Sequence, residues 1–199
     1  MKLICVGGAQ SGAGKTVVIE YLLRRLPGFL ALKVTPFHDH GIGHCPRQNP
    51  CGACEPSVEG YEIIDDEERL STDGKDTARM KAAGASRALW LRASPEGLKG
   101  GLDEALGSLA PCEGVVIEGN RPLVALPHAS KLFVVSRSLD LIKPRALDAF
   151  QAAHLIVVTE GMSEKVPGKV TVPFPPAPGD GENSFIAAVL KAALENPSP

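Results

Sequence analysis

Near the N-terminus stands the stretch that decides the fold, Leu3-Ile4-Cys5-Val6-Gly7-Gly8-Ala9-Gln10-Ser11-Gly12-Ala13-Gly14-Lys15-Thr16. Its four apolar residues run into glycine, which is typical of a buried parallel strand. After Lys15, apolar residues recur with the spacing of one helix face, at Ile19, Leu22, Leu23 and Leu26. The segment between strand and helix has the pattern of a phosphate-binding loop, with Ala9 where glycine is commonest.

The chemistry of such a loop explains the order of its residues. Glycines let backbone amides turn inward around phosphate oxygens, and the start of the helix adds partial positive charge. Lys15 supplies a cation for the terminal phosphates, and the Thr16 hydroxyl can ligate Mg²⁺. We therefore expect GTP or ATP to bind, with Mg²⁺, at Ala9, Gln10, Ser11, Gly12, Ala13, Gly14, Lys15 and Thr16.

A phosphate-binding loop also needs an acidic residue at the end of a neighbouring strand, to hold Mg²⁺ through water. Glu118 ends the apolar run 114–118 and has the expected position. Asp39 and Asp76 are competing candidates, because each stands at a loop on the same carboxyl edge of the predicted sheet.

The composition is that of a soluble globular protein. The 199 residues are 44% hydrophobic and 22% charged, and Lys+Arg 21 against Asp+Glu 23 gives a net charge of -2, which does not favour nucleic acid as a partner. No apolar run reaches the roughly 18–20 residues of a membrane span. Five cysteines without a secretion signal argue for thiol or metal chemistry in a reducing compartment, so we expect a cytoplasmic protein.

Apolar strand-like runs alternate with helical patterns along the chain, which predicts an α/β fold with three layers and a mostly parallel central sheet. We expect a single domain over residues 1–199, with an insertion at 36–73 and a C-terminal helix at 183–195. Further strands are predicted at 29–35, 88–91, 114–117, 132–135 and 155–158, an edge strand at 170–172, and helices from 74 to about 83, at 98–109 and at 145–152.

Four segments carry a family resemblance. They are the phosphate-binding loop, Lys33–Asp39, Gly74-Lys75-Asp76-Thr77 leading into Lys81–Ala85, and Val116–Gly119. In this order they resemble the molybdopterin-guanine dinucleotide biosynthesis protein B family. Asn120 departs from that pattern, since the family usually has an aromatic residue after Glu-Gly.

The resemblance implies a P-loop NTPase fold, weak GTP hydrolysis with Mg²⁺, a homodimer, and help in attaching a nucleotide to molybdopterin, a step that involves a cofactor-synthesis partner protein. It makes Lys15 and Thr16 the phosphate and metal contacts, Asp76 a site residue and Glu118 the strand-end acid. We accordingly expect Lys15, Asp76 and Glu118 to carry the catalysis.

A cluster of cysteines and histidines lies in the predicted insertion. Its members are His38, His40, His44, Cys45, Cys51 and Cys54. The CxxC spacing of Cys51 and Cys54 lets two thiolates face one ion, and a third thiolate with a histidine would complete a tetrahedral Zn²⁺ site. Three thiolates and another ligand equally suit an iron–sulfur cluster, whereas a redox CxxC fits less well among prolines. His38 and His40 could contact substrate phosphate in place of metal.

These features favour a Mg²⁺-dependent NTPase similar to the molybdopterin-guanine dinucleotide accessory protein. One alternative is a metal-delivery NTPase in which Cys45, Cys51 and Cys54 hold a cargo ion. The other is a P-loop kinase or ligase that acts on a small molecule.

Overall fold

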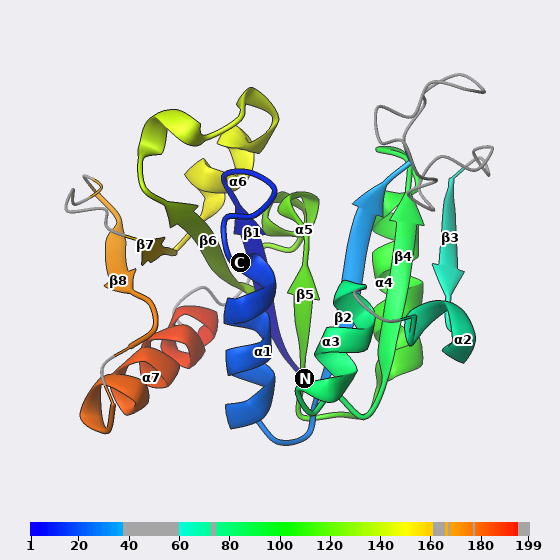
Figure 1. The fold of residues 1–199 in the computed structure, drawn as a ribbon. Helices are drawn as coiled ribbons and strands as arrows, with labels where there is room; N and C mark the ends of the chain where they lie inside the picture. The colour runs from blue at the N-terminus through cyan, green and yellow to red at the C-terminus, as the bar shows by residue number, and fades with distance from the viewer. Residues whose placement is uncertain (38–59, 73–74, 161–165, 167, 177, 195–199) are drawn as a thin grey trace.

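The computed structural model describes residues 1–37, 60–72, 75–160, 166, 168–176 and 178–194. Within these ranges eight strands form one sheet, which stands at the centre of the structure (Figure 1). The strands are β1 (Lys2–Gly8), β2 (Phe29–Pro36), β3 (Tyr61–Ile64), β4 (Ala88–Ala93), β5 (Gly114–Glu118), β6 (Ser130–Ser136), β7 (Leu155–Glu160) and β8 (Val170–Pro173).

The first strand lies near the middle of the sheet, between β5 and β6. The order across the sheet is β3-β4-β2-β5-β1-β6-β7-β8, and neighbouring strands run parallel except β3, which is antiparallel to β4. The predicted α/β class with a mostly parallel sheet is confirmed. The carboxyl ends of the parallel strands meet at one edge, which is where ligands bind in open sheets of this kind.

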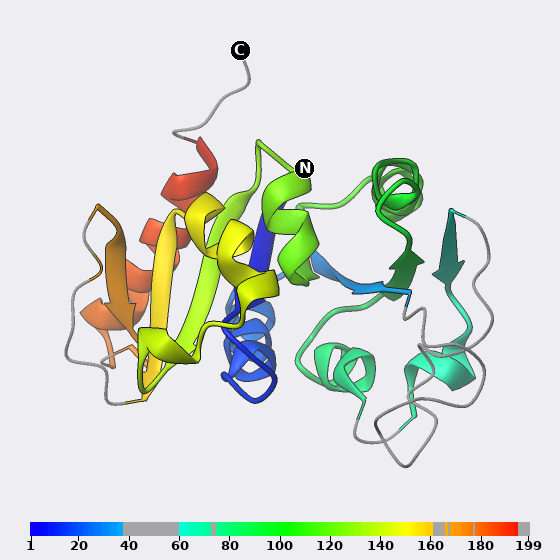
Figure 2. The same ribbon diagram turned by 90° about the horizontal axis from the view of Figure 1, so that it is seen from above.

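Helices cover both faces of the sheet and produce the predicted three layers. They are α1 (Lys15–Arg25), α2 (Glu67–Leu70), α3 (Asp76–Ala82), α4 (Leu98–Leu109), α5 (Asn120–Ala125), α6 (Leu147–Ala152) and α7 (Asp180–Leu194). Figure 2 shows α1 and α3 on one side of the sheet and α4, α5 and α6 on the other. None of the described helices combines the length and the apolar content that crossing a bilayer requires.

Successive side chains of β1 pack on opposite faces of the sheet, against different layers of helices. Ile4 and Val6 are buried in an apolar cluster with residues of α1, α3 and α7, whereas Cys5 belongs to the cluster that includes residues of α4, α5 and α6. Burial on both faces explains why this strand is a continuous apolar run.

Most predicted elements are found at the expected positions. The helix predicted at 98–109 is α4, and the helix predicted after Gly74 is α3. All the strands predicted from the sequence are present, and each is one to three residues longer than predicted. The predicted edge strand is β8, which pairs only with β7 among the described strands.

The C-terminal part of the predicted insertion at 36–73 contains two regular elements that were not predicted. Residues 61–64 form β3 at the edge of the sheet, paired with β4, and α2 follows. Ile64 and Leu70 are buried against Trp90. These apolar side chains allow this part of the chain to join the core. The cysteine-rich sequence before it has almost no aliphatic side chains.

Two helix boundaries also differ from prediction. The C-terminal helix begins at Asp180 and not at residue 183, with Asp180 and Glu182 in its first turn, where carboxylates interact favourably with the helix dipole. The helix predicted at 145–152 is divided into a 3₁₀ turn, Pro144–Ala146, and α6.

A substitution in β5 tests how closely this strand packs against its neighbours β1 and β2. A Cβ on Gly114 would overlap the Phe29 ring and lie 2.7 Å from the Lys2 carbonyl oxygen. We expect Gly114→Ala to lower the free energy of unfolding by about 1–3 kcal/mol, because the Lys2 backbone cannot shift away from the new Cβ without a cost in free energy. Urea unfolding followed by circular dichroism measures the change.

Gly107→Ala is the matched control, because a Cβ on this α4 residue meets nothing within 4 Å. We expect it to leave stability unchanged or to raise it by about 0.5–1 kcal/mol, as helix propensity predicts. Equal effects of the two substitutions would contradict the packing described here.

Candidate functional site

The phosphate-binding loop connects the end of β1 at Gly8 to the start of α1 at Lys15. Gly12 and Gly14 have φ angles of 80° and 94°, in the left-handed region that favours glycine. A Cβ on Gly14 would also lie 2.9 Å from the Thr159 Cγ2 methyl group. The glycines of the sequence motif therefore stand where the backbone requires them.

Residues of β6, of β7 and of the segment just before Pro144 fix the backbone of the loop. The Ala9 amide donates to the Val134 carbonyl (3.0 Å), and the Ala9 carbonyl accepts from the Lys143 amide (3.2 Å). The Thr159 hydroxyl donates to the Ala13 carbonyl (2.9 Å). Ala9 and Ala13 are buried, so the methyl group that replaces glycine at position 9 packs into the core.

Several amides of the loop have no acceptor within the described part of the chain. They are the backbone N–H groups of Ser11, Gly12, Gly14, Lys15 and Thr16. A run of unpaired amides at a helix start is the arrangement that binds phosphate oxygens.

The side chain of Lys15 lies along the loop. Its Nζ donates to the Gln10 carbonyl (3.2 Å). A Cβ on Gly8 would lie 2.8 Å from the Lys15 Cγ, so glycine at position 8 makes room for the lysine. The cation is thereby held against the backbone of the loop.

Thr16 is joined to a residue sixty positions away in the sequence. Its Oγ1 donates to the Asp76 Oδ1 (3.1 Å), and the Lys33 Nζ donates to the Asp76 Oδ2 (2.6 Å). Burial would raise the pKa of Asp76, but the hydrogen bonds and charge of Lys33 and the bond from Thr16 outweigh it, and the pKa is lowered. Asp76 is therefore ionised at neutral pH.

Glu118 lies next to this group at the end of β5. Its register partners are Val6 on β1 and Lys33 on β2, so it stands at the carboxyl edge beside the loop. The side chain is buried, and its Oε2 accepts no hydrogen bond from the described residues.

Burial raises the pKa of the Glu118 carboxyl, and the negative charge of Asp76 raises it further. The charges of Lys33, Lys15 and Arg79 act in the opposite direction without cancelling the shift. A buried carboxylate of this kind is stabilised by a cation, which makes Glu118 a candidate metal-site residue.

Sequence reasoning missed the role of Asn120. Its Oδ1 accepts from the Gly8 amide (2.8 Å), and its Nδ2 donates to the Gly8 carbonyl (3.1 Å). The Asn120 side chain thus bonds both the N–H and the carbonyl of Gly8, the last residue of β1 before the loop. In the sequence, the sign of a special role was that asparagine stands where the family usually has an aromatic residue. The sequence does not show what Asn120 contacts, because Gly8 is 112 residues away.

The remaining predicted site residues lie outside the described part of the chain. They are His38, Asp39, His40, His44, Cys45, Cys51 and Cys54. Within the described ranges, no group of three or more His, Cys, Asp or Glu residues could hold a metal ion. The zinc and iron–sulfur hypotheses therefore stay predictions.

The two described cysteines agree with a packing role. Cys5 and Cys112 are free, and burial raises the pKa of the Cys5 thiol to about 12, against a smaller lowering by Lys131. Such a thiol is not nucleophilic at neutral pH.

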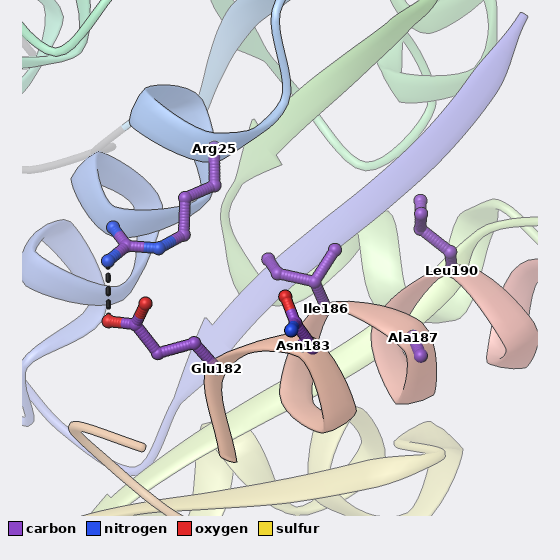
Figure 3. A pocket seen from close by; sticks show the side chains of 6 residues that line it. All are labelled: Arg25, Glu182, Asn183, Ile186, Ala187 and Leu190. Carbon is purple, nitrogen blue, oxygen red and sulfur yellow. Dashed lines mark hydrogen bonds and ion pairs between the residues drawn. The ribbon is translucent and has the colours of Figure 1, made fainter. Parts of the chain in front are cut away.

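A groove of about 390 Å³ lies at the far end of α1 (Figure 3). Arg25 and Glu182 meet across it in an ion pair of 2.6 Å, and α7 provides its apolar lining. The ten-residue span from Lys15 to Arg25 separates it from the phosphate-binding loop by about 15 Å. We therefore do not assign this groove to the nucleotide.

Comparison with known proteins does not assign this chain to a family. No protein-family model and no curated protein matches the sequence. A solved structure that is similar is the "apo" form of LpxK from Aquifex aeolicus in complex with ATP, with 19% sequence identity and a TM-score of 0.48. The match covers 87% of this chain and 53% of that one, so the chain spans about half the length of LpxK. The assignment of the site rests on its own residues.

The buried carboxylate makes a prediction about stability and pH. The folded-state pKa of Glu118 lies above the value of about 4.3 in an unfolded chain. Its ionisation therefore destabilises the fold as the pH rises above that value, and has no effect well below it. We expect Glu118→Gln to raise the free energy of unfolding at pH 8 by about 1 kcal/mol, and the gain to vanish near pH 4.

Urea unfolding of both proteins between pH 4 and pH 8 measures the difference. The control is Glu113→Gln, which removes an exposed carboxylate just before the same strand and should show no such trend. A gain that is constant across the pH range would mean that the charge of Glu118 is not the cause.

Proposed function

We propose that this protein binds a nucleoside triphosphate, GTP or ATP, with Mg²⁺ and hydrolyses it slowly. The observation that carries the proposal is the convergence of Thr16, Asp76 and Glu118 beside a phosphate-binding loop in which several amides have no acceptor among the described residues. Thr16 donates to Asp76 at 3.1 Å, and Glu118 brings a buried oxygen without a partner among the described residues.

The loop would bind the phosphates. The amides of Gly12, Gly14, Lys15 and Thr16 provide donors that have no other acceptor among the described residues, and the Lys15 side chain provides a full positive charge. Both stabilise negative charge that develops on the phosphates during hydrolysis, and both are positioned before the nucleotide arrives.

The oxygen ligands suit Mg²⁺. This ion prefers hydroxyl, carboxylate and water oxygens and usually binds one or two carboxylates together with phosphates. Thr16, Asp76 and Glu118 supply one hydroxyl and two carboxylates, and the unpartnered Glu118 Oε2 is the atom that most needs a cation. When bound, Mg²⁺ would neutralise charge on the phosphates of the nucleotide.

The family resemblance extends the proposal to a pathway. The segment around Asp76 carries much of that resemblance, and Asp76 lies in contact with Thr16. We infer that the NTPase assists the attachment of a nucleotide to molybdopterin, together with a cofactor-synthesis partner protein and as a homodimer.

Nucleotide binding should depend on Lys15. We expect Lys15→Ala to weaken the binding of ATP or GTP by tenfold or more, because a charge-assisted contact contributes about 1.5–3 kcal/mol. Calorimetric titration with each nucleotide in the presence of Mg²⁺ measures the affinity and shows which base is preferred.

Lys99→Ala serves as the control, since Lys99 is an exposed lysine of α4 paired with Asp103. It should bind nucleotide as the unsubstituted protein does. Unchanged affinity in the Lys15 variant would remove the basis of the proposal.

The pathway role has a separate test. We expect the protein with Mg²⁺ and GTP to increase the rate at which a nucleotidyltransferase produces molybdopterin guanine dinucleotide, and the Lys15→Ala variant not to do so. Product formation followed by chromatography measures the rate. A rate independent of the protein would exclude this role and leave nucleotide binding untouched.

A further inference from the structure

Lys33 occupies an unusual position for a lysine. It lies on β2 at the carboxyl edge of the sheet, and its Nζ donates to the Asp76 Oδ2 at 2.6 Å. Its side chain is only 20% exposed. The ammonium also lies 5.7 Å from the centre of the Trp90 ring, and that ring is fixed by a hydrogen bond from its Nε1 to the Thr35 hydroxyl.

The same lysine stands beside the second carboxylate. Lys33 and Glu118 are register partners on the parallel strands β2 and β5, so their side chains lie on the same face of the sheet. Glu118 is buried, with an Oε2 that accepts no hydrogen bond from the described residues. Lys33 thus bonds one carboxylate and is the strand neighbour of the other.

The other cations near Glu118 are engaged elsewhere. The positive charges that act on it are those of Lys33, Lys15 and Arg79. Lys15 donates to the Gln10 carbonyl, and Arg79 forms an ion pair of 2.6 Å with Glu20. Among these three, Lys33 is the one whose ammonium bonds to Asp76, the carboxylate next to Glu118.

We propose that Lys33 is a built-in counter-ion for the divalent-cation site: its ammonium pairs with Asp76 in the nucleotide-free protein and leaves when Mg²⁺ and nucleotide arrive together. The inference rests on the proposed function, since it concerns the same site. An ammonium at the Asp76 carboxylate disfavours a divalent ion at Thr16 and Asp76, because the two cations repel each other.

The displaced ammonium requires a new anion. A phosphate group of the incoming nucleotide supplies one at this edge of the sheet, whereas a metal ion alone does not. Lys33 therefore opposes the binding of metal alone and favours the joint binding of metal and nucleotide. The two ligands bind cooperatively, with Lys33 as the element that couples them.

The test measures metal binding without nucleotide. Mn²⁺ is the probe, and its free concentration is followed by electron paramagnetic resonance during titration of the unsubstituted protein and Lys33→Met. We expect the variant to bind Mn²⁺ at least fivefold more tightly, within the usual range of coupling between sites. Addition of ATP or GTP should then enhance Mn²⁺ affinity less in the variant than in the unsubstituted protein.

Two further variants guard against a folding defect. Lys33→Gln removes the charge and retains a donor for Asp76, so it should also tighten Mn²⁺ binding. Lys33→Arg retains the charge and should behave as the unsubstituted protein. Circular dichroism establishes that each variant is folded.

The outcomes separate this inference from the proposed function. Mn²⁺ affinity that is equal or weaker in folded Lys33→Met and Lys33→Gln, or undetectable in every protein, overturns the counter-ion role. Tighter Mn²⁺ binding in these variants without nucleotide binding by any of the proteins supports the counter-ion role and contradicts the proposed function.

Discussion

The parallel pairing of β1 with β5 is the constraint on which the site depends. It aligns Val6 with Glu118 and so places the strand-end carboxylate beside the start of the phosphate-binding loop. The pairing of β5 with β2 then aligns Glu118 with Lys33. A shift of one residue in either register would move these side chains to the opposite face of the sheet, where they could not reach Thr16.

The loop is prepared for its ligand by contacts with four other parts of the chain. Asn120 at the start of α5 pairs with Gly8, Val134 of β6 and Lys143 bind the backbone of Ala9, and Thr159 of β7 binds that of Ala13. These contacts leave the amides of Ser11, Gly12, Gly14, Lys15 and Thr16 without a competing acceptor in the described structure. The loop needs little reorganisation to receive phosphate, which lowers the cost of binding.

The order of strands and helices was predictable from local patterns, since β1, α1 and α4 are specified by continuous apolar runs and helical spacing. The short strand β3 was not, because four residues at a sheet edge are ordered by packing of Ile64 against Trp90. In the site, Lys15 and Thr16 follow from their motif. The contact that selects Asp76, and the pairing of Asn120 with Gly8, join distant segments, and no local pattern encodes them.

The central claim is that the unpaired amides of the phosphate-binding loop bind a nucleoside triphosphate. Nuclear magnetic resonance of ¹⁵N-labelled protein tests it most directly, by titration with ATP or GTP in the presence of Mg²⁺. The account predicts that the largest amide shifts occur at Ser11, Gly12, Gly14, Lys15 and Thr16. Shifts that avoid these residues, or a spectrum unchanged at saturating nucleotide, would contradict it.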